Sequence, residues 1–130
     1  MELNLPLGHF EVFDAIPETL SDDTYYVPLS TNFAAIDALT KKAALQYSVA
    51  PIHPIKGVRV VENVASLFPS CTLDFVFIVP MSIAAGFLKQ QILTSKGAVP
   101  QNMPLVRQWV VGLPLGIDTS YDRKRKRSEG

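Results

Sequence analysis

The most hydrophobic stretch of the chain covers residues 71–93, and every other segment must pack around it. Its first part, up to Pro80, is rich in β-branched and aromatic residues, and over residues 73–79 apolar side chains occupy both alternating sets of positions. A strand that is apolar on both faces is expected in the middle of a sandwich or at an interface. Pro80 interrupts the stretch, and residues 83–93 are compatible with a short helix, although Gly86 weakens that prediction.

Other segments show the alternation and the residue types of strands. Strands are predicted at residues 24–29, 45–50 and 105–113. Residues 3–16 predict a short strand or an extended arm, and the valine-rich residues 57–65 predict a strand or an irregular loop. Prolines stand at the ends of most of these segments, where a missing N–H does not interrupt a ladder of hydrogen bonds.

One segment, residues 30–43, predicts the clearest helix of the chain. Its first three residues are good helix caps, and two lysines fall in the last turn, where they complement the helix dipole. The apolar residues at helical spacing are Phe33, Ile36, Leu39 and Ala43. This pattern is typical of a short amphipathic helix that covers one side of a sheet.

Together these segments predict a mainly β protein, an antiparallel sandwich of jelly-roll type in full or shortened form, with one or two short helices. The chain of 130 residues has the size of one domain. We expect a single β-rich domain over residues 1–118 and a flexible basic tail over residues 119–130. With 48% hydrophobic and 18% charged residues, the composition excludes disorder and suggests a surface partly covered by other subunits.

Secretion and membrane insertion are not expected. Residues 1–20 contain no Lys or Arg, whereas a signal peptide begins with basic residues. The uncharged run over residues 75–88 is shorter than the roughly 20 residues of a membrane span. The single cysteine, Cys71, cannot form an internal disulfide, and we expect it to be a buried, inert thiol. These observations predict an intracellular protein.

Charge is distributed unevenly although the formal net charge is zero. All charged residues within residues 1–40 are acidic, namely Glu2, Glu11, Asp14, Glu18, Asp22, Asp23 and Asp37. The basic residues of the tail are Arg123, Lys124, Arg125, Lys126 and Arg127. Such a run fits a polyanion-binding arm, a nuclear import signal, a contact with the acidic region of a neighbouring copy, or a solvated tail.

No segment predicts catalysis, a metal site or a cofactor. The chain has no glycine-rich phosphate loop, no cluster of Cys and His, and no serine in a nucleophile elbow. His53 lies between two prolines without a second ligand nearby in sequence, and a metal site needs three or four. Asp22 and Asp23 form a carboxylate pair, but in a polar turn such a pair is typically solvated. We therefore expect a protein that is not an enzyme.

Two segments within residues 26–97 follow each other in a recognisable order, VPLSTNFAAIDALTKKAALQYSVAPIHPI and, after a valine-rich connection, LDFVFIVPMSIAAGFLKQQILTSKGAV. Within the second segment, Val79 and Pro80 follow a strand, and then come Gln91, Ile92 and Leu93, and then Gly97. This order resembles that of the coat proteins of small icosahedral plant viruses of the tymovirus type. The resemblance implies a jelly roll that self-assembles and encloses RNA. The chain ends earlier than those proteins do, so it implies either a shortened sandwich or strands supplied by a partner chain.

Two functions follow as expectations. The first is a viral structural, coat-like protein that forms homo-oligomers through Phe75, Phe77 and Trp109 and contacts nucleic acid through residues 123–127, with RNA favoured and DNA left open. The second is a small non-enzymatic viral accessory or regulatory protein, a β-rich interaction module whose tail binds RNA or a nuclear import receptor. The expected location is the host cytoplasm or nucleus, or the virion.

Overall fold

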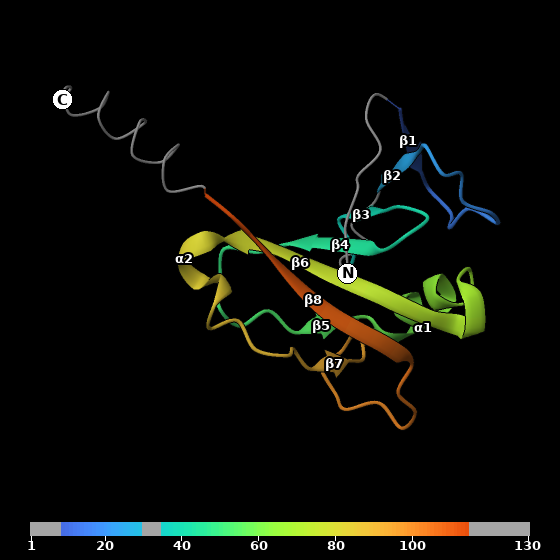
Figure 1. The fold of residues 1–130 in the computed structure, drawn as a ribbon. Helices are drawn as coiled ribbons and strands as arrows, with labels where there is room; N and C mark the ends of the chain where they lie inside the picture. The colour runs from blue at the N-terminus through green and yellow to red at the C-terminus, as the bar shows by residue number, and fades with distance from the viewer. Residues whose placement is uncertain (1–8, 30–34, 115–130) are drawn as a thin grey trace.

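The computed structural model describes residues 9–29 and 35–114, and its main feature is a six-stranded sheet (Figure 1). The order of strands across the sheet is β1-β2-β3-β4-β6-β8. These strands are β1 (Phe10–Phe13), β2 (Tyr25–Pro28), β3 (Ala38–Leu39), β4 (Ala44–Tyr47), β6 (Thr72–Pro80) and β8 (Leu105–Leu113). Strands β4, β6 and β8 are mutually parallel, β1 is parallel to β2, and β3 is antiparallel to both of its neighbours.

The predicted antiparallel jelly-roll sandwich is therefore wrong, and the fold is mixed α/β with a mainly parallel sheet. Parallel neighbours cannot be joined by a tight hairpin and need a long crossover connection. The first crossover, from β4 to β6, contains β5 (Ile55–Lys56), α1 (Val58–Ala65) and the 3-10 helix η2 (Pro69–Cys71). The second, from β6 to β8, contains α2 (Met81–Ala84) and β7 (Ile92–Leu93).

Both crossovers lie on the same side of the sheet, which we call the crossover face. Strands β5 and β7 pair in parallel beneath the six-stranded sheet, and α1 and α2 lie near opposite ends of β6 (Figure 1). Apolar side chains from β5, β7, α1 and the segment after α2 join those of β6 in one buried cluster. The opposite side, the second face, has a smaller buried cluster formed by Ala38, Ala43, Leu45, Val76 and Ile78.

Strand β6 is the central element of both clusters and confirms the strand predicted from the alternation over residues 73–79. Its residues on the crossover face are fully buried, namely Leu73, Phe75, Phe77 and Val79. The ring of Phe77 lies 5.2 Å from that of Phe75 and 5.0 Å from that of Phe87, between centroids. Val76 and Ile78 are buried on the second face. The side chains of β6 are thus buried on both faces, by the crossovers on one face and by neighbouring side chains of the sheet on the other, which explains the two-sided hydrophobicity of this sequence.

The valine-rich residues 57–65, predicted as a strand or a loop, form helix α1. The buried side chains are Val61, Val64 and Ala65, whose spacing places them on one side of a helix. Gly57 precedes the helix with φ of 130°, a conformation that glycine adopts without strain. The need for a covered crossover between β4 and β6 thus overrides the strand propensity of the valines.

The helix predicted over residues 30–43 is wrong wherever the structure describes this segment. Ala38 and Leu39 form strand β3, and a turn at Thr40 leads into β4. The Thr40 hydroxyl accepts hydrogen bonds from the backbone N–H groups of Lys42 and Ala43, both at 3.1 Å. Such local bonds favour a turn over a helix. Leu39 and Ala43 belong to buried clusters on opposite faces of the sheet, which no single helical stripe could supply.

The remaining strand predictions are confirmed, with small shifts at their ends. Strands β2, β4 and β8 correspond to the predicted strands at residues 24–29, 45–50 and 105–113, and β1 lies within the predicted arm at residues 3–16. The helix expected over residues 83–93 is wrong in extent, because α2 ends at Ala84 and the chain continues without a helix into β7. Of the residues described, none belongs to a helix long and apolar enough to cross a membrane.

Candidate interaction surface

Strand β8 forms one edge of the six-stranded sheet and carries the most conspicuous candidate surface of the molecule. All nine of its residues pair with β6 on one side, and no described strand pairs with its other side. Apolar side chains along it are exposed, at 62% for Leu105, 38% for Val110 and 37% for Leu113. A long, apolar edge strand offers unpaired backbone groups to another strand and is a typical site of chain association.

The side chains of β8 alternate between the two faces of the sheet. Val106 packs against the cluster of the crossover face, and Gln108 bonds to the segment between α2 and β7 on that face. Trp109 and Val111 pack against the cluster of the second face. A strand paired to the outer edge of β8 would therefore meet two different environments, one on each face.

On the second face, Asp74 of β6 fastens β8 by three hydrogen bonds. Its carboxylate accepts from Nε of Arg107 at 2.8 Å, from Nη2 of Arg107 at 3.0 Å, and from Nε1 of Trp109 at 2.9 Å. Two-point bonding between a guanidinium and a carboxylate is stronger and more directional than a neutral hydrogen bond. The edge strand is thus held firmly on the side that faces its own chain, and no described strand pairs with its outer side.

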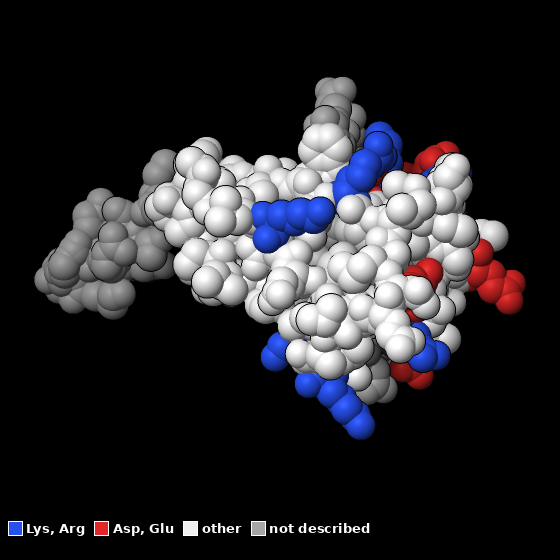
Figure 2. All heavy atoms as spheres, turned by 90° about the horizontal axis from the view of Figure 1, so that it is seen from below, with Lys and Arg blue, Asp and Glu red and all other residues white. Residues whose placement is uncertain are grey.

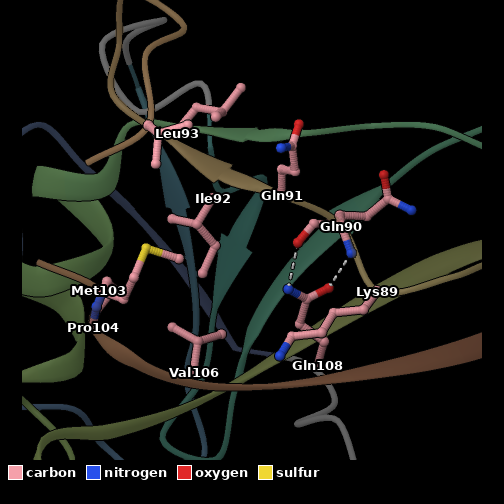
Figure 3. A pocket seen from close by; sticks show the side chains of 10 residues that line it. Lys89, Gln90, Gln91, Ile92, Leu93, Met103, Pro104, Val106 and Gln108 are labelled. Atoms are coloured by element: carbon pink, nitrogen blue, oxygen red, sulfur yellow. Dashed lines mark hydrogen bonds between the residues drawn. The ribbon is translucent and has the colours of Figure 1, made fainter. Parts of the chain in front are cut away.

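On the crossover face, a groove of about 490 Å³ lies beside β8 (Figure 3). Gln108 closes one part of it, because its Oε1 accepts from the backbone N–H of Gln90 at 2.8 Å and its Nε2 donates to the carbonyl of Gln90 at 2.9 Å. The apolar lining comes from Ile92, Leu93, Val99, Met103, Pro104 and Val106, and the polar lining from Lys89, Gln90, Gln91 and Gln108. The groove is therefore a mainly apolar channel that borders the free edge.

The surface around α2 is apolar and uncharged. Residues 80–88 contain no charged side chain, and Met81 and Leu88 are exposed. Figure 2 shows the molecule from below, with Asp and Glu gathered toward one end and Lys and Arg spread over the middle and lower parts of the described surface. The end of the molecule that carries α2 is accordingly suited to contact with another apolar surface.

Polar groups elsewhere form structural contacts. The hydroxyls of Tyr25 and Tyr47 are hydrogen-bonded across strand β3, and the backbone N–H of Tyr47 donates to Oδ2 of Asp37 at 2.8 Å. Burial, and secondly the bond to Tyr47, raise the pKa of the Tyr25 hydroxyl above its usual value. Among the described residues, no three His, Cys, Asp or Glu side chains lie close enough together to hold a metal ion.

Each residue predicted for association or binding has a definite place relative to this surface. Phe75 and Phe77 are fully buried in the core of their own chain, so their side chains offer no surface to a partner. Trp109 lies at the middle of the edge strand β8. The basic residues 123–127 lie outside the described part of the chain. The groove residues were missed in the sequence, where Gln90, Val106 and Gln108 show no motif that connects them.

Comparisons with protein-family models, with curated proteins and with solved structures give no significant match for this chain.

Proposed function

We propose that this chain is a non-enzymatic interaction protein that pairs with a second copy through the outer edge of β8 and binds a polyanion, preferably RNA, through its basic residues 123–127. The observation that carries the proposal is the nine-residue apolar edge strand, which no described strand covers. A protein that remained a monomer would be expected to protect such an edge by charge, by a bulge or by shortening it.

A second copy is the natural partner of this edge. When a strand pairs antiparallel with its own copy about a two-fold axis, each free donor meets a free acceptor of the same strand, and the interface closes after two subunits. The two sheets would then form one continuous sheet of twelve strands. The coat-like role expected from the sequence depended on a jelly roll, and the mainly parallel sheet gives that role no support.

Sedimentation velocity of the full chain over a concentration series tests the pairing. We expect a reversible equilibrium between monomer and dimer, without higher species, because β8 provides one closed interface. Hydrogen exchange adds a local readout, since backbone amides on the outer side of β8 become protected only in the dimer. A chain that stays monomeric at the highest attainable concentration contradicts the pairing.

Filter binding to single-stranded RNA at several salt concentrations tests whether the basic residues 123–127 bind RNA. If the five basic residues each contact a phosphate, the logarithm of the affinity falls with the logarithm of the salt concentration with a slope of about −3.5. Replacing Arg123 to Arg127 by alanine removes the binding, and a matched variant in which the three arginines become lysine retains it. Equal binding by the alanine variant contradicts a role of the tail in RNA binding.

A further inference from the structure

The sequence of β8 itself defines how two copies can align. Pro104 precedes the strand and Pro114 follows it, and neither can donate a backbone hydrogen bond. Trp109 is equidistant from the two prolines. An antiparallel alignment centred on Trp109 pairs all nine residues of β8 and leaves both prolines outside the ladder, whereas a shift of the centre by one residue brings Pro114 opposite Val106. The pairing of two copies therefore has one favoured register.

In this register, a two-fold axis perpendicular to the sheet keeps the crossover faces of both subunits on the same side. Val106 of one copy lies opposite Gly112 of the partner subunit, and Gln108 lies opposite Val110 of the partner subunit. Directly opposite residues in antiparallel strands have Cα atoms about 4.5–5.5 Å apart. Whatever covers Gly112 on the crossover face thus comes close to Val106 of the other copy.

Helix α2 covers Gly112 at very short range. A Cβ atom built on Gly112 would lie 2.9 Å from Cβ of Ala84, which is closer than Cβ atoms approach one another, and 3.0 Å from Sδ of Met81, which is a tight contact. The glycine is required here so that the helix can rest on the backbone of β8. The two-fold axis consequently carries α2 of one subunit to the Val106 end of β8 in the other subunit, where the apolar groove lies.

We infer that α2 of each subunit enters the groove beside β8 of the other, with Met81 as the side chain that contacts Val106. This inference rests on the proposed pairing of β8. The surfaces are compatible, because residues 80–88 bring no charge into a groove whose lining is mainly apolar. The groove volume of about 490 Å³ is within the range of pockets that hold small ligands and can take a methionine side chain.

Disulfide trapping tests this contact. Cys71 is exposed, so the predicted burial of its thiol is wrong, and it is first replaced by serine. Met81→Cys and Val106→Cys are then introduced together. Within one chain the two positions lie near opposite parts of β8, about 20 Å apart for six residues of strand, and a disulfide needs Cα atoms within about 7 Å. Oxidation is therefore expected to give a covalent dimer on a non-reducing gel, while each single-cysteine variant gives little.

A second variant keeps the test independent of disulfide geometry. Met81→Lys places a second cation in a groove whose only charged lining residue is Lys89, and we expect the dissociation constant of the dimer to rise by at least about tenfold, because an unpaired charge beside a like charge is costly to bury. Covalent dimers together with a weakened Met81→Lys dimer support the inference. A reversible dimer that gives no disulfide and tolerates Met81→Lys overturns it and leaves the β8 pairing intact. A purely monomeric protein overturns both.

Discussion

The two edges of the six-stranded sheet differ in length and in charge. Strand β8 has nine residues, of which only Arg107 is charged, and that side chain is paired with Asp74. Strand β1 at the other edge has four residues and also exposes apolar side chains, at 65% for Phe10 and 51% for Val12. Exposed apolar residues alone therefore do not explain why one edge would associate and the other would not.

The acidic surroundings of β1 make the difference. Residues 9–29 contain no Lys or Arg, and their exposed acidic residues are Glu11, Asp14, Glu18, Asp22 and Asp23. Two copies that approached each other through β1 would bring like charges together, which opposes association. The short, acidic edge is protected, and the long edge, whose one charged side chain is paired with Asp74, is available, as expected for a sheet that associates through one edge only.

The largest effect on dimer formation is expected when a charge is introduced into the β8 edge. Val110→Lys introduces a cation at the middle of β8, where pairing with a second copy would bury it. Taking an ion out of water costs several kcal/mol, so the dimer dissociation constant should rise by about 100-fold or more. Sedimentation velocity over a concentration series measures this change.

Val12→Lys is the matched control for that experiment. Val12 lies in β1 and is exposed to 51%, compared with 38% for Val110, so both substitutions place a lysine on a partly exposed edge position. The control should dimerise like the unmodified chain. If Val12→Lys weakens association and Val110→Lys does not, the associating edge is β1, and the comparison of the two edges is reversed.

A smaller effect is expected from loosening β8 on its own sheet. Asp74→Asn removes the carboxylate that accepts bonds from Arg107 and Trp109. Arg107 is largely exposed and its contribution is reduced by solvent, so we expect a loss of about 1–2 kcal/mol in the free energy of unfolding. Urea denaturation of dilute protein, followed by the fluorescence of Trp109, measures this loss.

The control for Asp74 lies near the β1 edge. Asp22 pairs with Lys41 at 3.4 Å, but both side chains are largely exposed, and such pairs contribute less than about 1 kcal/mol. Asp22→Asn should therefore leave the unfolding midpoint almost unchanged. Equal losses for the two variants would show that Asp74 fastens β8 no more strongly than a surface ion pair does.

The strands of this fold were more predictable than their directions. Residues 72–80 and 105–113 have clear alternation and β-branched content, and both form strands. Their parallel pairing depends on what the intervening residues do, and strand propensity carries no information on that. The valines of α1 favoured a strand by composition, although their spacing of three residues, Val58, Val61 and Val64, fits the helix that forms.

The candidate surface was predictable only in part. Trp109 was expected to contribute to association, and it lies in the edge strand that we propose as the interface. Phe75 and Phe77 were expected to do the same because they are large and apolar, yet the crossovers bury them completely. The groove depends on residues from positions 89–108 that come together only when β7 passes beneath β8, so no local pattern could indicate it.

The smallest expected effect concerns pH and the half of the sheet that lies away from β8. Burial, and secondly the hydrogen bond to Tyr47, raise the pKa of Tyr25, so the folded chain holds this proton at a pH where the unfolded chain, with a pKa of 10.0, has lost it. This contribution to stability is complete below pH 10 and is lost as the pH rises above that value. Tyr25→Phe should therefore make the decline of stability in alkali shallower.

Urea denaturation between neutral pH and pH 11 measures this difference, with Tyr47→Phe as the comparison. Tyr47→Phe removes the same hydrogen bond but leaves Tyr25 able to ionise, so it should retain more of the alkaline decline than Tyr25→Phe does. Tyr25 lies in β2 and Tyr47 lies in β4, and neither strand borders the outer edge of β8. Dimer formation at neutral pH should therefore be the same in both variants as in the unmodified chain.

Two outcomes would contradict this account. An equal alkaline decline of stability in the unmodified chain and in Tyr25→Phe would show that Tyr25 does not couple folding to pH. A weakened dimer in either variant would show that the two halves of the sheet are not independent.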